Sequence, residues 1–211
     1  MTTKPQKLSS QDELTSAERA FRTVFKTTET FVNPFQTEIT KCVILFSEPY
    51  ALEGKYLNAI GRSALESGDT NIAYISLIEG LSGNEFSSRF HWSFDLFDYP
   101  YEELRKDEDW FPLMENAIYS LNGAWGIIFS EYGHAIIGGS NLFFDALERQ
   151  VPQIHEDVYL FLAEIKVDIE SSRKTVPYFQ GWLPNLLSSI YGSSQAATML
   201  ADKGLDVILS P

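Results

Sequence analysis

The sequence predicts an α+β fold: a single domain in which helices pack on a mixed sheet of about six strands, followed by a helical C-terminal appendage. Three observations lead to this prediction. Three short apolar runs separated by turn residues lie between residues 115 and 139, a strand–helix–strand pattern spans residues 41–78, and amphipathic helical patterns flank both. We expect residues 1–8 to form a disordered tail, residues 9–167 the α+β domain, and residues 168–211 the appendage, packed on the same domain.

The first helix is predicted from residue 10 to about Phe31. Ser10 and Glu13 have the spacing of a capping box, in which each side chain accepts a hydrogen bond from the backbone N–H of the other residue. Apolar residues then recur at helical spacing, which indicates an amphipathic helix. Asn33 and Pro34 end the pattern, because proline has no backbone N–H and restricts the residue before it.

A strand–helix–strand unit follows. Lys41–Phe46 has the apolar, β-branched character of a buried strand, Pro49 opens a helix that runs to about Glu66, and residues 72–78 form the next strand. A unit of this length is compatible with a right-handed crossover between parallel strands, so we expect these two strands to pair in parallel.

A three-strand meander is predicted over residues 117–120, 125–129 and 134–137. Asn122 and Gly123 join the first two strands, and this dipeptide accepts the positive φ angles of a two-residue type I′ turn. Residues 131–133 make the second reversal. Apolar side chains lie on both faces of the middle strand, which predicts that it is central in the sheet.

Helical patterns fill the rest of the chain. Ser140 or Asn141 can cap a helix that ends before Pro152, and a second helix is expected over residues 155–167. Proline and glycine residues then separate two shorter helical segments in the predicted appendage.

Composition and charge narrow the classes of function. The chain has 211 residues, is 44% hydrophobic and has a net charge of −13, so we expect an ordered protein that repels nucleic acid and anionic membrane surfaces. Neither a secretory signal nor an apolar run long enough to cross a bilayer is found, which favours a soluble, cytoplasmic protein. The single cysteine, Cys42, lies in an apolar run and is interpreted as a small buried hydrophobic residue.

An acidic segment between His91 and Phe111 is the first candidate site. Seven acidic residues stand against two basic ones between Asp95 and Asp109, and large aromatic residues are interleaved with them. Aromatic anchors inside a charged rim are typical of protein-binding surfaces, although a core strand with hydrated acids would give the same pattern. The preferred hypothesis is a non-catalytic protein that binds a basic protein partner, as a bacterial immunity protein binds a cationic toxin. The contact residues predicted are Asp95, Asp98, Tyr99, Tyr101, Glu102, Glu103, Asp107, Asp109 and Trp110.

A small-ligand binder or an enzyme is the alternative hypothesis. A strand is predicted over residues 89–97, and His91 and Asp95 fall on its polar face. His134 begins the last strand of the meander, and Gly138 and Gly139 lead into a helix where backbone N–H groups can surround an anion. A solvated strand face and a plain strand-to-helix connection explain the same residues. Metal-ligand spacing, a nucleophile motif and a phosphate loop are all missing, so we expect no catalytic residue, metal or cofactor.

A homodimer through the C-terminal helices is a third hypothesis. It rests on large apolar side chains that recur through the predicted appendage: Tyr178, Phe179, Trp182, Leu186, Leu187 and Ile190.

Overall fold

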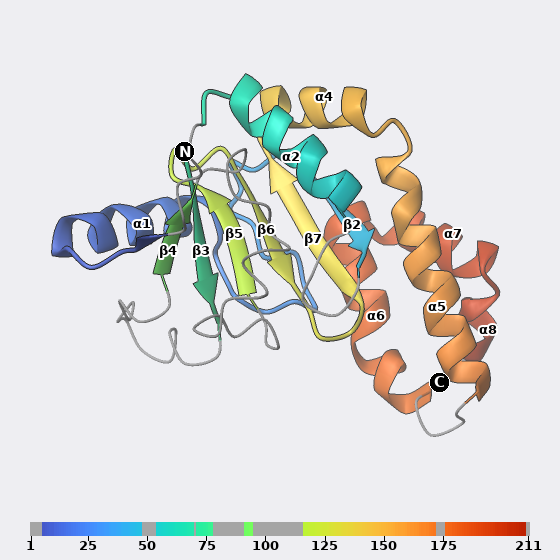
Figure 1. The fold of residues 1–211 in the computed structure, drawn as a ribbon. Helices are drawn as coiled ribbons and strands as arrows, with labels where there is room; N and C mark the ends of the chain where they lie inside the picture. Colours follow the sequence, from blue (N-terminus) through green and yellow to red (C-terminus); the bar gives the residue numbers. More distant parts are fainter. Residues whose placement is uncertain are drawn as a thin grey trace.

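Helices cover both faces of one antiparallel sheet in the computed structural model of this protein (Figure 1). This arrangement confirms the α+β class. The structure describes residues 6–47, 54–69, 71–77, 91–94, 116–171 and 176–209.

The sheet of the described residues has seven strands in the order β1-β4-β3-β5-β6-β7-β2, and every neighbouring pair is antiparallel. Two of the seven, β1 and β4, have two and four residues. The bounds are β1 (Gln6–Lys7), β2 (Lys41–Phe46), β3 (Ile72–Ser76), β4 (His91–Phe94), β5 (Asn116–Ser120), β6 (Trp125–Phe129) and β7 (His134–Gly139).

The predicted parallel pairing of β2 with β3 is wrong, and so is the mixed sheet that depended on it. These strands run in the same direction, but β5, β6 and β7 lie between them. Short turns close β5, β6 and β7 into a meander with two open edges, and each edge can accept one more strand. Helix α2 (Gly54–Glu66) connects β2, paired with β7, to β3, paired with β5.

Both hairpins of the meander are confirmed. The register of β5 with β6 centres their turn on Asn122 and Gly123, but the connection is a four-residue loop in which the Gly123 N–H donates to the Ser120 carbonyl over 3.1 Å. Gly123 has a φ of 75°, a value that glycine adopts without steric cost. The turn from β6 to β7 is residues 131–133, closed by a 3.0 Å hydrogen bond from the Ser130 N–H to the His134 carbonyl.

One face of the sheet is covered by α2 and α4 (Asn141–Gln150). Side chains alternate between faces along each strand, so Trp125, Ile127 and Phe129 of β6 all point into this layer. Trp125 stacks on Phe143 of α4, with ring centroids 5.0 Å apart and planes at 7°. Ser140 caps α4 as predicted, because its Oγ accepts a hydrogen bond from the Phe143 N–H.

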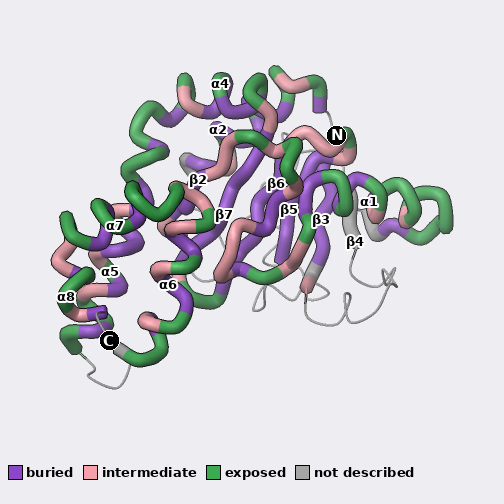
Figure 2. The backbone as a smooth tube through the Cα atoms, turned by 180° about the vertical axis from the view of Figure 1, so that it is seen from behind, coloured by how far each residue is buried: buried purple, intermediate pink, exposed green. Residues whose placement is uncertain are grey.

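The other face is covered by α1 (Gln11–Val24), the segment after it and the C-terminal helices. The predicted capping box of Ser10 and Glu13 is confirmed, but the helix ends at Val24 and not near Phe31. Phe25 is extended and forms a β-bridge with Phe35, because both rings pack on glycines of the sheet. Buried strands between helices with exposed outer surfaces are visible in Figure 2.

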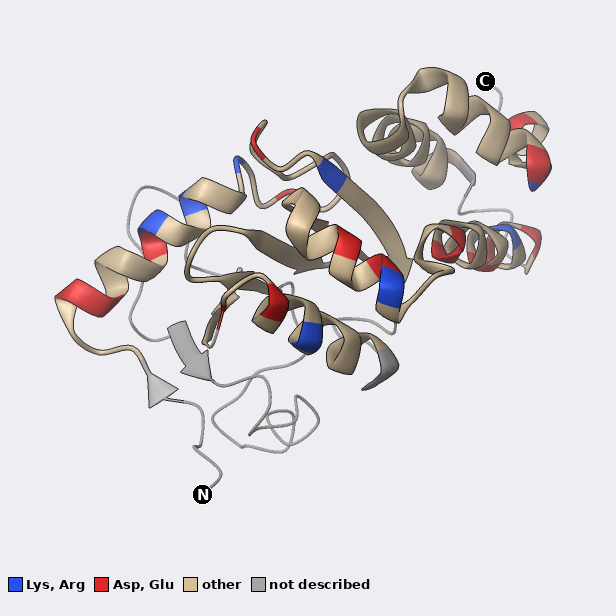
Figure 3. Cartoon of the chain, turned by 90° about the horizontal axis from the view of Figure 1, so that it is seen from above, with Lys and Arg blue, Asp and Glu red and all other residues tan. Residues whose placement is uncertain are grey.

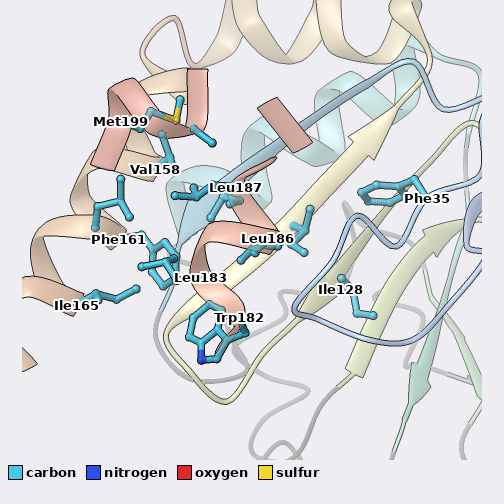
Figure 4. Packing of buried hydrophobic residues seen from close by; sticks show 14 of the residues in the cluster. Phe35, Ile128, Val158, Phe161, Ile165, Trp182, Leu183, Leu186, Leu187 and Met199 are labelled. Carbon is cyan, nitrogen blue, oxygen red and sulfur yellow. The ribbon is translucent and has the colours of Figure 1, made fainter. Parts of the chain in front are cut away.

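The C-terminal helices are α5 (Asp157–Ser171), α6 (Val176–Tyr191), α7 (Ser193–Asp202) and α8 (Leu205–Ile208), and the short turn Ile154–Glu156 precedes them. Helix α5 packs beside β2, and the predicted boundary at residue 168 falls inside it. Leu183, Leu186 and Leu187 of α6 lie in one cluster with Val158 and Phe161 of α5 (Figure 4). Strands and C-terminal helices therefore share one core.

Candidate functional site

The predicted partner-contact segment lies outside the described residues. This applies to Asp95, Asp98, Tyr99, Tyr101, Glu102, Glu103, Asp107, Asp109 and Trp110. In the part of the chain that the structure describes, acidic positions are spread over α1, α2, α4 and α5 (Figure 3).

The residues of the alternative pocket are not brought together. His91 is on β4 and His134 is on β7, with β3, β5 and β6 between them, which corresponds to roughly 19 Å at the usual strand spacing. His134 begins β7, whereas Gly138 and Gly139 end it. A single pocket cannot be lined by all four residues in this arrangement.

Gly138 and Gly139 are explained by packing. A Cβ atom at Gly138 would lie 2.6 Å from ring carbons of Phe35, and one at Gly139 would lie 2.6 Å from a ring carbon of Phe143. Each glycine therefore admits an aromatic ring against the backbone, on opposite faces of the sheet.

His134 is a core residue. It is fully buried, its Nε2 lies 2.9 Å from the Thr30 carbonyl, and its ring contacts Phe161 and Trp182 with centroids 4.9 and 5.8 Å away. Burial lowers the pKa of His134 from 6.5 to about 4, because the charged form is poorly solvated there. A neutral imidazole sealed from solvent, donating from Nε2, has a structural role and no access to a substrate.

We expect His134 to make the folded state sensitive to acid. The pKa of His134 is lower in the folded state than in the unfolded state. Below pH 6.5 the imidazole is therefore protonated in the unfolded chain while it stays neutral in the folded chain. Stability should therefore fall as pH decreases from 6.5 towards about 4, by about 2 kcal/mol between about pH 7 and pH 5. Urea unfolding of the wild type and of His134→Gln at both pH values measures this effect.

The glutamine variant keeps a donor for the Thr30 carbonyl but does not titrate, so its loss of stability between the two pH values should be smaller by that amount. His155→Gln is the control, because His155 is exposed beside Glu148 on the surface. Equal pH dependence in the wild type and His134→Gln would contradict the assignment.

A cavity of about 380 Å³ lies where the end of β2 and the β6–β7 turn meet α5 and α6. Four of its residues, Phe161, Glu164, Ile165 and Asp168, follow one another at the spacing of a single helix face of α5. The complete lining among the described residues is Phe46, Ser47, Glu131, Tyr132, Gly133, Phe161, Glu164, Ile165, Asp168 and Phe179.

The cavity is acidic and aromatic. Three carboxylates and four aromatic rings line it, and no lysine or arginine of the described residues does. Glu164 and Asp168 are exposed, and neither takes part in an ion pair within the described ranges. Hydrogen bonds with the side chains of Tyr178 and Glu131 raise the pKa of Tyr132, so its phenol is neutral at physiological pH.

Ser47 supplies a polar group in the lining. The residue is only 2% exposed, and its Oγ has no hydrogen-bond partner among the residues that the structure describes. Its backbone N–H donates to the Gly133 carbonyl over 3.1 Å, which holds the end of β2 against the β6–β7 turn. A buried hydroxyl without a partner is uncommon in folded proteins and is satisfied when a ligand or water reaches it.

Sequence reasoning missed this cavity. The spacing of Phe161, Glu164, Ile165 and Asp168 was a usable signal, because it mixes acids into the apolar face of a helix. The partners on β2 and the β6–β7 turn carried no such signal, since they are far away in the chain.

Cys42 was predicted to be buried, and the structure shows it partly buried, packed against the core. Desolvation raises the pKa of its thiol to about 11, so the nucleophilic thiolate is scarce at neutral pH. Within the described residues, no group of three or more His, Cys, Asp or Glu side chains is placed to hold a metal ion. The described helices are also too short or too polar to span a bilayer.

Most side chains proposed for a homodimer contact belong to the chain's own core. Phe179, Trp182, Leu186 and Leu187 are at most 8% exposed, whereas Tyr178 is 41% exposed. Burial in the single chain removes these four from any surface that a second copy could contact.

Comparison of the chain with models of protein families, with curated proteins and with solved structures finds no match.

Proposed function

We propose that this chain is a non-catalytic acidic binding protein that recognises a basic protein partner. The observation that carries the proposal is the cavity beside α5, where the carboxylates of Glu164 and Asp168 stand next to aromatic rings and no lysine or arginine of the described residues belongs to the lining. A bacterial immunity protein that neutralises a cationic toxin is one kind of protein with this chemistry.

Electrostatics support a basic partner. The net charge of −13 produces a field that attracts a cationic protein and speeds the encounter, and the effect weakens as salt is added. The acidic, aromatic segment from His91 to Phe111 adds seven carboxylates against two basic residues between Asp95 and Asp109. We propose that this segment contributes to the same recognition.

The small-ligand or enzyme hypothesis has less support. It required His91, His134, Gly138 and Gly139 to converge, and they lie on different strands or at opposite ends of one strand. The His134 side chain is sealed in the core and cannot serve as an acid or base for a bound substrate.

Reversing four acids of the proposed contact segment should remove partner binding. In the variant Glu102→Lys, Glu103→Lys, Asp107→Lys and Asp109→Lys, we expect affinity for a basic protein captured by the wild type to fall at least about tenfold, because attraction becomes repulsion. The captured protein is identified by mass spectrometry and purified, and its affinity is measured by calorimetry at two salt concentrations.

The matched control reverses four exposed acids elsewhere: Glu29→Lys, Glu38→Lys, Glu170→Lys and Asp202→Lys. Both variants have the same net charge, so a difference between them reports the location of the binding surface and not the overall field. Equal losses in the two variants would remove the segment from the proposal, and capture of acidic proteins alone would refute it.

A further inference from the structure

We infer that the cavity beside α5 is a binding site for the guanidinium group of an arginine side chain on the partner protein, an inference that rests on the proposed function. The site is formed by Glu164 and Asp168 of α5, the buried hydroxyl of Ser47, and the aromatic rings around them.

The two carboxylates have the geometry to hold a cation. Glu164 and Asp168 are four residues apart on α5, so their side chains leave the helix on the same face, one turn apart. Carboxylates accept two parallel hydrogen bonds from the planar guanidinium group, which gives arginine an orientation that a single ammonium group lacks.

Aromatic rings form the walls. Phe46, Tyr132, Phe161 and Phe179 line the cavity from four separate parts of the chain: β2, the β6–β7 turn, α5 and α6. Trp182 packs against two of these rings, with its ring centroid 6.4 Å from that of Phe161 and 5.7 Å from that of Phe179. A guanidinium group stacks on such rings and is more weakly hydrated than an ammonium group, so it loses less on entering.

Ser47 is an independent indication of a ligand. Ser47 is a lining residue, and its buried hydroxyl has no hydrogen-bond partner among the described residues, so it is available to accept a hydrogen bond from a guanidinium N–H group that reaches it. The volume of about 380 Å³ lies near the lower end of the range of about 300–1,000 Å³ for ligand pockets, which suits one side chain.

Other ligand classes fit less well. An anion would meet three carboxylates with no basic side chain among the described lining residues. A purely apolar side chain would leave the Ser47 hydroxyl without a partner. A lysine side chain would satisfy the charge, but its ammonium group cannot stack flat between rings or bind both carboxylates through one plane.

The test titrates the full chain with three blocked amino acids: N-acetyl-arginine methylamide, the corresponding lysine compound and the neutral citrulline compound. The indole N–H resonance of Trp182, assigned with Trp182→Phe, reports binding because this ring packs on the cavity walls. We expect the arginine compound to bind more tightly than the lysine compound, and the citrulline compound to bind at least about tenfold more weakly, because it has the same shape without the charge.

The variant Glu164→Gln with Asp168→Asn should weaken binding of the arginine compound at least about tenfold, because it removes the charge but keeps the shape. The control Glu170→Gln with Asp202→Asn changes the net charge equally at exposed positions outside the cavity, and it should keep wild-type affinity. Both substituted pairs are on the surface, and matched thermal unfolding verifies that each variant is folded. Ser47→Ala should reduce affinity about threefold or more through the lost acceptor.

Absence of binding by the arginine compound, or equal affinity in the cavity and control variants, would overturn the inference. If the lysine compound bound more tightly than the arginine compound, the site would be one for an ammonium group and the inferred specificity for arginine would be overturned. The inference and the proposed function can fail separately. If the arginine compound binds but no basic protein partner is found, the arginine site stands and the proposed function is rejected. If a basic partner is captured equally well by the wild type and by the Glu164→Gln, Asp168→Asn variant, the proposed function stands and the arginine site is rejected.

Discussion

Replacing Asp69 with alanine is expected to lower the free energy of unfolding by about 4 kcal/mol, because the change removes a buried carboxylate on which three side chains converge. Asp69 lies between α2 and β3 and is 2% exposed. Its Oδ1 accepts hydrogen bonds from Ser120 Oγ (2.9 Å) and Asn122 Nδ2 (2.7 Å), and its Oδ2 accepts one from Trp125 Nε1 (2.8 Å).

The large effect has two sources. Hydrogen bonds to a charged acceptor contribute about 1.5–3 kcal/mol each, although bonds within one network are not additive. In addition, the alanine variant leaves the indole N–H of Trp125 buried without an acceptor, since this residue is fully enclosed between the sheet and α4. The same carboxylate ties the end of α2 to the β5–β6 turn, so the hairpin should loosen as well.

Chemical denaturation of Asp69→Ala measures the effect, and Trp125→Phe separates its parts. The phenylalanine keeps a ring against Phe143 and removes one donor, so its cost should be about 1–2 kcal/mol. The control is Asp145→Ala, which removes a surface ion pair with Lys41 that contributes about 1 kcal/mol or less. If Asp69→Ala cost no more than Asp145→Ala, the carboxylate would not hold the turn.

Gly126→Ala and Gly138→Ala are each expected to destabilise the fold by about 3 kcal/mol, through overpacking. The two glycines face each other across β6 and β7 and form one hollow in the sheet. A Cβ atom at Gly126 would lie 2.5 Å from Phe25 Cζ and 2.7 Å from Val24 Cγ1, and one at Gly138 would lie 2.6 Å from the Phe35 ring. Real Cβ atoms do not approach other atoms this closely, so the rings would have to move.

The packing around the two rings prevents them from moving aside. Phe25 and Phe35 stack on each other with centroids 5.3 Å apart, and each is at most 2% exposed. Gly181→Ala in α6 is the matched control, because no atom of the described residues outside the helix lies within 4 Å of its added methyl group. That control should be neutral or stabilise the protein by up to about 1 kcal/mol, as alanine does in a helix interior.

Urea denaturation of the three single variants and of Gly138→Ala combined with Phe35→Leu measures these effects. The smaller leucine should relieve part of the clash, so the double variant should be more stable than the sum of its single changes predicts. If the losses of stability in the double variant were additive, or if Gly138→Ala were as stable as Gly181→Ala, the packing of the Phe35 ring would not require a glycine at position 138.

The meander, the first helix cap and the α4 cap were predictable because each depends on residues close together in the chain. Gly123 and Gly133 adopt left-handed φ angles inside their own turns, and Ser10 and Ser140 cap helices through the next few residues. Such contacts require little loop closure, so the local sequence is enough to specify them.

The predictions were wrong where contacts between distant parts of the chain override the local sequence pattern. The first helix was expected to reach Phe31, but it ends at Val24 because Phe25 turns away to pack on Gly126 of β6. The parallel pairing of β2 with β3 was also wrong. Its spacing satisfies the rule for a crossover, but the open edges of the meander were the better partners for both strands.

The sequence by itself determined the α+β class, the acidic charge and the local turns and caps, since these depend on composition and on neighbouring residues. Only the tertiary structure decided the order of the strands, the burial of His134 and the cavity of Phe46, Ser47, Glu164 and Asp168. The physical reason is that these features depend on which surfaces exclude water from one another after collapse, and more than 100 residues separate Ser47 from Phe161 in the chain.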